Sequence, residues 1–381
     1  MIQATLIAAV IWLQAGLCAH ASETPHAAQA AGYIWYPRGD AEQQGHMSAV
    51  VGRKPKIRWS VKTGGAINSS AALDASHAYV GSDDGKLYAI ERTTGVVSWT
   101  FEAQGPVQAA PVVVGDSVIV GSADGNLYAI HTATGVLQWK IATADKLIAA
   151  VSPVTIQAVS AVIVGGGDGL IQAVRVADGK ALWSHKTESY IFGSAAVSDN
   201  RVIVGGCDGF VHILNLEDGS LIRRVQVGPY VGSSVAVAGN HAFFGHFGNQ
   251  VAGVDISTGA YLWHTPDSGF PYLSSAAVDD SVVYLGGRNR KMVALAAADG
   301  REQWSFEALA RIDGSPVLFD GGVLFGAGDG RMYQLQQSNG TLLWSLDLGA
   351  SISTTPAADK NWMVVGTHDG TVYGIETRNK P

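Results

Sequence analysis

The sequence predicts an all-β fold, an eight-bladed β-propeller made of four-stranded blades. Three observations predict it. Tryptophan recurs about every forty residues, glycine-rich turns recur at the same interval, and the segments between them are short runs rich in Val, Ile and Tyr, separated by Asp, Gly and Thr. Two markers that share one period from Trp59 to Gly366 indicate a repeat architecture. A period near forty residues with four strands is typical of a propeller blade.

The tryptophans define eight equivalent positions. Successive members of the series are 40, 40, 44, 80, 41 and 40 residues apart, so the gap of 80 covers two periods. Arg223 stands at the skipped position, four residues after Gly219, just as Trp99 stands four residues after Gly95. We expect each indole to lie on the outermost strand of its blade and to cover the neighbouring blade. These structural docking residues are Trp59, Trp99, Trp139, Trp183, Trp263, Trp304 and Trp344.

Each period contains four strand-like runs separated by turn residues. In the first period, Asp84-Gly85 predicts a hairpin turn, because glycine adopts positive φ without a Cβ clash. No segment shows a sustained 3.6-residue apolar period, which argues against helices. The strands predicted for this period are Ser69–Leu73, His77–Gly81, Lys86–Glu91 and Val96–Phe101.

The two ends of the array predict how the ring closes. The last repeat has three strands, over residues 354–356, 362–366 and 371–376, and then stops. Near the other end, residues 56–62 (KIRWSVK) form an outermost strand with no strands before it. Pairing these two ends completes an eighth blade and removes an open sheet edge. We therefore expect that deleting residues 56–62 destabilises the protein far more than deleting residues 22–45.

The residues before the ring predict an export signal and a linker. Residues 4–17 are an apolar run, and Ala19-His20-Ala21 resembles a signal-peptidase cleavage sequence, although no Lys or Arg precedes the run. We expect residues 1–21 to be a signal peptide, 22–55 a linker and 56–381 the propeller. A lipid anchor at Cys18 is the alternative, but lipoproteins prefer a residue smaller than Leu17 before that cysteine. The protein is thus expected to be periplasmic or associated with the outer membrane.

Composition excludes several kinds of partner. The net charge is −7 and no block of Lys or Arg stands out, which argues against a nucleic-acid-binding protein. No later segment is long and apolar enough to span a bilayer as a helix. If Cys18 is removed with the signal, Cys207 remains alone and the mature protein has no internal disulfide.

The repeat resembles a known family. The pattern Ala89-x-Glu91-x-x-Thr94-Gly95-x-x-x-Trp99 is similar to the tryptophan-docking motif of pyrroloquinoline-quinone (PQQ)-like propellers, and it recurs before most of the other tryptophans. None of these tryptophans is followed by Asp, so the chain does not resemble a WD40 propeller. The resemblance covers residues 56–376 and implies the same ring of blades.

The resemblance implies two possible functions. Quinoprotein dehydrogenases hold PQQ and Ca²⁺ at the centre of the propeller, and many carry adjacent cysteines that this chain lacks. Acidic residues near the expected channel mouth are also few, Asp313 being the clearest, whereas calcium needs six or more oxygen ligands. The chain is closer to the non-catalytic BamB family of outer-membrane assembly scaffolds. This implies no catalytic residue, no cofactor and no metal; the alternatives are a PQQ-dependent quinoprotein oxidoreductase and a carbohydrate-binding propeller.

One face of the ring carries the candidate binding residues. The connector that enters the innermost strand and the turn between the second and third strands lie on the same face, and in the fourth to seventh repeats they hold aromatic and basic residues. Such residues are favoured at protein interfaces, so we expect a protein or extended peptide to bind here, with the chain a monomer within a larger complex. The alternative is that the rings only pack between blades. The candidates are Tyr190, Phe192, Tyr230, His246, Phe247, Phe270, Tyr272, Arg288, Arg290 and Arg311.

Overall fold

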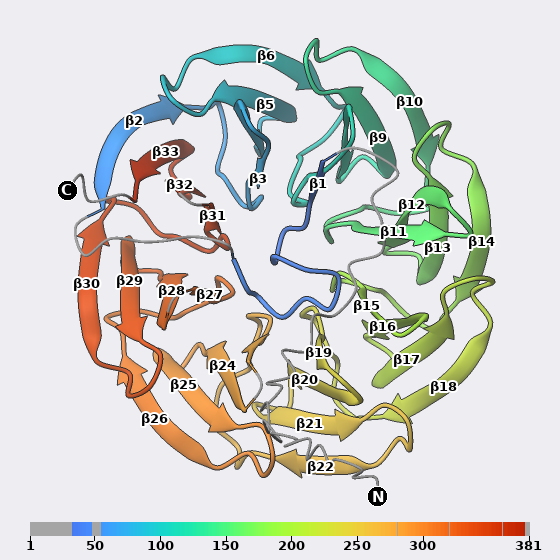
Figure 1. Cartoon of the computed structure of the whole chain (residues 1–381), viewed down its shortest axis with the longest axis vertical. Helices are drawn as coiled ribbons and strands as arrows, with labels where there is room; N and C mark the ends of the chain where they lie inside the picture. The colour runs from blue at the N-terminus through green and yellow to red at the C-terminus, as the bar shows by residue number, and fades with distance from the viewer. Residues whose placement is uncertain (1–32, 48–54, 280, 320, 360, 378–381) are drawn as a thin grey trace, which may run out of the picture. The chain divides into compact units, whose positions relative to one another are not determined.

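A computed structural model describes residues 33–47, 55–279, 281–319, 321–359 and 361–377. The predicted signal peptide and Cys18 lie outside the described residues. The described residues from 33 onward form eight antiparallel sheets arranged around one axis (Figure 1). This confirms the predicted eight-bladed β-propeller. Among the described residues no helix is long and apolar enough to cross a membrane.

Four blades form the first half of the ring. Blade 1 contains β3 (Ala72–Leu73), β4 (His77–Gly81), β5 (Lys86–Glu91) and β6 (Val97–Glu102). Blade 2 contains β7 (Val112–Val114), β8 (Ser117–Gly121), β9 (Asn126–His131) and β10 (Leu137–Ala142). Blade 3 contains β11 (Ser152–Ile156), β12 (Val159–Gly165), β13 (Leu170–Arg175) and β14 (Ala181–Lys186). Blade 4 contains β15 (Ala196–Ser198), β16 (Arg201–Gly205), β17 (Phe210–Asn215) and β18 (Leu221–Gln226).

Four more blades complete the ring. Blade 5 contains β19 (Ala236–Ala238), β20 (His241–Gly245), β21 (Val251–Asp255) and β22 (Tyr261–His264). Blade 6 contains β23 (Ala277–Val278), β24 (Val282–Gly286), β25 (Lys291–Ala296) and β26 (Glu302–Glu307). Blade 7 contains β27 (Val317–Phe319), β28 (Gly322–Gly326), β29 (Arg331–Gln336) and β30 (Leu342–Asp347). Blade 8 contains β31 (Ala357–Ala358), β32 (Trp362–Gly366) and β33 (Thr371–Glu376), and its outermost strand is β2 (Lys56–Lys62).

The pairing of β2 with β33 closes the ring as the sequence predicts. The two strands are antiparallel, with Lys56 opposite Glu376 and Lys62 opposite Thr371. Arg58 forms an ion pair with Glu376 across the same pair of strands. In Figure 1 the blue strand β2 therefore lies beside the red strands of blade 8, although some 300 residues separate them in the sequence.

The predicted strands of the first repeat agree with blade 1 except at the innermost strand. The sequence predicts it over Ser69–Leu73, but β3 begins at Ala72. The two preceding serines bond to neighbouring blades instead of to β4. Ser69 Oγ donates to the carbonyl of Ala109 at 2.9 Å, and Ser70 Oγ accepts from the amide of Thr355 at 2.9 Å.

The indoles connect successive blades. Six of them donate Nε1–H to a backbone carbonyl of the next blade at 2.7–2.9 Å; Trp59, for example, donates to Arg92. Each of these six rings lies against the glycine of the turn before the next outermost strand. At Gly95, which has φ +76°, a Cβ atom would come within 2.7 Å of Trp59. The Thr-Gly turn in the repeat thus leaves room for the indole of the preceding blade.

Two positions depart from this arrangement for reasons visible in the chain. Trp344 donates to the side chain of Gln334 in its own blade, because blade 8 takes its outermost strand from β2 and has no equivalent turn. At the skipped position, Arg223 lies against Gly259, where a Cβ would come within 3.2 Å of Arg223 Cδ. The stem of an arginine thus occupies the place of an indole.

Residues 33–47 are part of the ring. The sequence predicts a linker over 22–55, but β1 (Ile34–Trp35) pairs with β7 as a fifth strand of blade 2. The backbone then follows the inner edges of blades 4 to 7, where the carbonyls of Ala41, Glu42, Gln44 and Gly45 accept amide hydrogen bonds from β15, β19, β23 and β27 at 2.8–2.9 Å. This position of the backbone has a physical reason. The innermost strands expose unpaired amides toward the axis, and the segment, which we call the axial segment, satisfies them.

Candidate functional site

The face that carries the predicted binding residues is defined by two kinds of loop in each blade. These are the connectors into the innermost strands and the turns between the second and third strands; we call it the loop face. All ten candidates lie in such loops. They differ in exposure and in the contacts they make.

Four candidate rings are about half exposed. Tyr190, Tyr230, Phe247 and Phe270 have relative exposures between 49% and 58%. Phe192 is partly buried and stacks on Tyr190, with ring centroids 5.7 Å apart. Tyr230 meets Phe247 edge to face at 6.3 Å, and the Phe247 amide donates to the Tyr230 carbonyl at 3.0 Å. The sequence-predicted set thus forms aromatic pairs on blades 4 and 5 that present apolar surface to solvent.

Two candidates, His246 and Tyr272, are buried. His246 accepts a hydrogen bond from the Gly248 amide at its Nδ1, at 3.0 Å. Burial, with a smaller contribution from His264, lowers the pKa of His246. Tyr272 lies against Gly245, where a Cβ would come within 2.3 Å of it. Tyr272 therefore packs between blades 5 and 6.

The three candidate arginines are exposed and form ion pairs. Arg288 Nε and Arg311 Nε each lie 2.8 Å from the carboxylate of Asp313. Arg290 lies 2.6 Å from Glu307. Asp313, the acidic residue that the sequence places nearest the channel mouth, is therefore held between two guanidinium groups.

One exposed residue on this face is absent from the predicted set. Leu309 lies in the connector into β27 and is 71% exposed, the highest exposure among the large apolar residues that the structure describes. The forty-residue repeat could have predicted Leu309, because this residue falls in the connector that carries Tyr230 and Phe270 in the preceding repeats. The apolar rim therefore extends from blade 4 to blade 7.

The opposite side of the same rim is polar. Asp83, in the turn after β4, accepts hydrogen bonds at 2.9 Å from the side-chain amides of both Asn68 and Gln108. Ser353 is within 2.7 Å of His368 on blade 8. Blades 8, 1 and 2 thus present hydrogen-bonding groups where blades 4 to 7 present apolar side chains.

Inside the rim, a cavity of about 160 Å³ leads toward the axis. Its walls carry one small residue from the end of the connector that precedes each innermost strand. Six of these are hydroxyl residues, which we call the hydroxyl ring, and blades 2 and 3 have Ala110 and Ala150 instead. Four hydroxyls accept the amide hydrogen bond of a neighbouring blade at 2.9–3.0 Å. The hydroxyl ring comprises Ser70, Ser194, Ser234, Ser275, Ser315 and Thr355.

The axial segment forms the floor of this cavity. Pro37, Arg38 and Gln43 line it from below. Arg38 is 4% exposed and Gln43 is 1% exposed. Arg38 donates to the backbone carbonyls of Gln43 and Ala276, and burial lowers the pKa of its guanidinium to about 10. Among the described residues, Arg38 Nη1 and both polar atoms of the Gln43 amide have no hydrogen-bond partner.

The residues that line the cavity do not suit a calcium ion. No Asp or Glu is among the described residues that line it. Over the described part of the chain, no group of three or more His, Cys, Asp or Glu side chains is placed to hold a metal ion. Calcium takes six to eight oxygens, several of them from carboxylates, so these residues do not fit it. The axial segment also occupies the centre of the ring.

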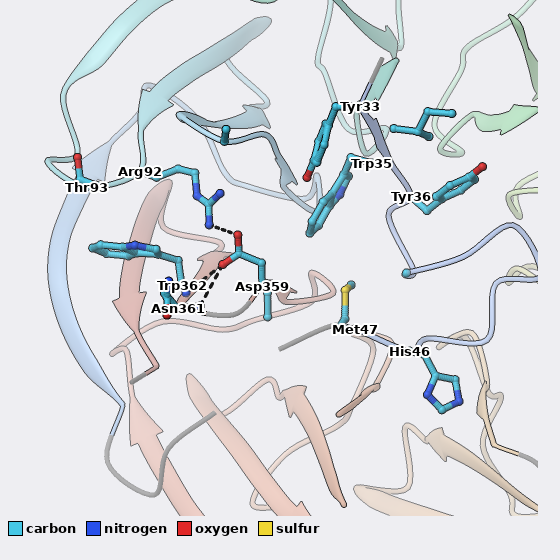
Figure 2. Close-up of a pocket in the computed structure, with 14 residues that line it drawn as sticks. Tyr33, Trp35, Tyr36, His46, Met47, Arg92, Thr93, Asp359, Asn361 and Trp362 are labelled. Carbon is cyan, nitrogen blue, oxygen red and sulfur yellow. Dashed lines mark hydrogen bonds and ion pairs between the residues drawn. The ribbon is translucent and has the colours of Figure 1, made fainter. Parts of the chain in front are cut away.

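Figure 2 shows the residues that line a second pocket, of about 570 Å³. It includes residues of the turns between the first and second strands of blades 8 and 1, which lie on the face opposite the loop face. Its walls include Tyr33, Trp35 and Trp362, and Arg92 forms an ion pair with Asp359 at its side. Burial raises the pKa of the Tyr33 hydroxyl. Like many small-ligand pockets, it combines aromatic walls with a few polar groups.

Cys207 offers no reactive thiol. It is buried in the turn after β16, and burial, together with Asp208, raises the pKa of its thiol. A raised pKa lowers the fraction of thiolate, which is the nucleophilic form.

Comparison with known proteins identifies a family. The family model described as outer membrane protein assembly factor BamB matches residues 44–190 and 167–379. A comparison with curated proteins finds no match.

Several solved structures share the fold. BamB from Moraxella catarrhalis is 18% identical, with a TM-score of 0.70, over 85% of this chain and 100% of that one. The quinohemoprotein alcohol dehydrogenase from Comamonas testosteroni is 13% identical, with a TM-score of 0.74, over 91% of this chain and 81% of that one. A europium-containing methanol dehydrogenase is 12% identical, with a TM-score of 0.73, over 90% and 97%. At these identities the likeness shows the fold alone.

Proposed function

The chain belongs to the family described as outer membrane protein assembly factor BamB, and from this premise we propose that it is a non-catalytic protein-binding scaffold of the bacterial cell envelope. The partner, a protein or an extended peptide, binds on the loop face. The protein acts as a monomer within a larger complex and is exported, residing in the periplasm or at the outer membrane.

The observation that carries this proposal is the apolar rim on blades 4 to 7. Tyr190, Tyr230, Phe247, Phe270 and Leu309 each leave about half or more of their surface exposed. Large apolar side chains gathered on one face of a soluble domain indicate an interaction surface, and aromatic residues are enriched at binding hot spots. Burying such rings against a partner is favourable at about 25 cal/mol per Å² of apolar area.

Arg288 and Arg311 lie at the edge of this rim, where they can form a polar boundary around an apolar contact. Arg288 and Arg311 share the single carboxylate of Asp313, so this exposed cluster keeps a net positive charge. Exposed charges are screened by solvent, and they are better suited to orient a partner than to supply most of the affinity. The aromatic and aliphatic side chains are therefore the proposed affinity determinants.

A cofactor-free function is part of the proposal. The cavity at the centre of the ring is lined by hydroxyl and amide groups and is floored by a cation, Arg38. This donor set suits an anion rather than Ca²⁺. The similarity to quinoprotein dehydrogenases is a similarity of fold and does not carry their activity to this chain.

Alanine at Tyr230, Phe247 and Arg290 together tests the proposal. The purified variant and wild type are used to capture partners from a solubilised envelope fraction, and the recovered proteins are quantified by mass spectrometry. A matched control replaces Leu221 and Ile222, two exposed apolar residues on β18 away from the loop face. We expect at least a tenfold loss of one specific envelope protein with the triple variant and none with the control. Equal recovery from all three proteins contradicts the proposal.

A further inference from the structure

The floor of the central cavity holds a buried cation, Arg38, whose neighbouring carboxylate, Asp40, acts on it without forming a direct ion pair. Arg38 is almost completely buried, and the two hydrogen bonds it makes go to backbone carbonyls. None of the ion pairs within 4.0 Å among the described residues includes it. A buried charge is stable when it is directly paired, so a guanidinium that lies beside a cavity with no direct ion pair and with Nη1 unpartnered among the described residues indicates a place for an anion.

The neighbouring groups are also donors. Gln43 also lines the cavity, and its buried amide has no hydrogen-bond partner among the described residues, so it can supply an N–H donor whichever way the amide is turned. In the hydroxyl ring, Ser234, Ser275 and Ser315 already accept a backbone amide, which leaves the hydroxyl proton free to donate. These donors belong to residues that line the same small cavity.

The backbone holds this arrangement in an unfavourable conformation. Gln43 has φ +60°, which L-residues other than Asn, Asp and Gly adopt at a cost. Its position is fixed by the neighbouring residue, because the Gln44 amide donates to Asp40 and the Gln44 side chain donates to the carbonyl of Val237, both at 2.8 Å. Unfavourable backbone conformations that the surrounding structure maintains are often found at functional sites, where they orient a side chain toward a ligand.

We propose that the floor of the central cavity is an oxyanion-binding site, in which Arg38 and Gln43 bind a carboxylate or a tetrahedral oxyanion and the hydroxyl ring supplies further donors. Two sources share this chemistry: a free anion such as phosphate, and a carboxylate of a peptide that enters from the loop face. The cavity of about 160 Å³ has room for such a group and several waters. The site stands independently of the proposed scaffold function, because a free anion requires no partner protein.

Direct binding to the full-length protein tests the site. Phosphate, sulfate and acetate are titrated by calorimetry at constant ionic strength, and selenate is located in a crystal by its anomalous signal. We expect saturable binding, with selenate between Arg38 and Gln43. No saturable binding of any of the three anions, or an anomalous peak elsewhere only, overturns the proposal.

Two variants locate the binding to these residues. Gln43→Asn shortens the amide while keeping a residue that tolerates positive φ, and we expect about tenfold weaker anion binding. Ser234→Ala copies the alanine naturally present at Ala110 and Ala150 and is expected to weaken binding severalfold while the protein stays folded, as checked by circular dichroism. Gln250→Asn, in a turn on the loop face, is the matched control and is expected to bind like wild type. Unchanged affinity in both folded cavity variants contradicts the proposal.

Peptide probes separate the two sources. Two forms of the peptide acetyl-Phe-Ala-Phe are compared, one with a free C-terminal carboxylate and one with a C-terminal amide. Displacement of bound phosphate by the acid but not by the amide assigns the site to a peptide carboxylate, whereas binding of inorganic anions alone assigns it to a free anion. Either result supports an oxyanion site, and neither depends on the partner capture that tests the scaffold function.

Discussion

Trp59 lies directly on Gly95, and its indole Nε1 donates to the carbonyl of Arg92 at 2.7 Å. This contact joins the blade that closes the ring to the blade that begins it. The same contact between an indole and a turn glycine recurs around most of the ring. The tryptophans therefore recur about every forty residues because each blade makes this contact with the next.

Replacing Gly95 with alanine should disturb this contact. The new Cβ would come within 2.7 Å of the indole and would also sit on a backbone with φ +76°. We expect a loss of about 3 kcal/mol in the free energy of unfolding, from steric overlap and backbone strain together. Gly115→Ala is the control, because Gly115 has φ +62° but nothing within 4 Å of a Cβ; it should cost about 1 kcal/mol. Equal losses in urea denaturation would argue that the indole contact contributes little.

Arg223→Trp should restore the contact that blade 4 lacks. Gly259 is already in the required left-handed conformation, with φ +80°, and the arginine stem lies against it. An indole there buries more apolar surface, so we expect the variant to be more stable by about 1 kcal/mol. The melting temperature is the measurement, and a decrease would show that the arginine has a role that the indole cannot replace.

Two deletions should separate the contribution of ring closure to stability from the contribution of the axial segment. Deleting residues 56–62 removes β2 and opens blade 8, so we expect no cooperative unfolding transition. Deleting residues 33–47 exposes the inner edges of blades 4 to 7 but leaves the ring closed, and should lower Tm by roughly 5–10 °C. Similar calorimetric traces for the two deletions would contradict this order.

Asp40 should make stability fall as pH rises. Burial raises the pKa of its carboxyl to about 6, against an ordinary value of 3.8, even though the Gln44 amide, His46 and Arg38 act in the opposite direction. Because the folded state holds the proton more tightly, the contribution of Asp40 is fully present below about pH 4 and is lost as pH rises through 6. Asp40→Asn cannot titrate, so the variant should gain roughly 2 kcal/mol relative to wild type between pH 4 and pH 7. A constant difference between the two proteins across this range would contradict the assignment.

The repetitive parts of the structure were predictable from the sequence, and the non-repetitive parts were not. The indoles and turn glycines recur with one period, so blade number and closure by β2 follow from counting. The axial segment occurs once and has no period, and its role depends on backbone hydrogen bonds that any side chain permits. For that reason the sequence offers no signal for Arg38 or Gln43 as the floor of a cavity.

The candidate site was predictable at the level of loops but not of side chains. The sequence places Tyr230 and Tyr272 in equivalent connectors, yet only the first is exposed, because Tyr272 packs against Gly245. The hydroxyl ring does follow the forty-residue period, and Ser194, Ser234 and Ser275 could have been found by aligning the starts of the innermost strands.

Site-specific photo-cross-linking in the native envelope tests most directly whether the loop face binds a protein. p-Benzoylphenylalanine is placed at Tyr230 or at Phe270 on the loop face, and at Ile222 on β18 as the control. We predict that both loop-face positions give a covalent adduct with the same envelope protein and that position 222 gives none. Adducts of equal yield at all three positions, or an adduct at position 222 alone, would contradict the account.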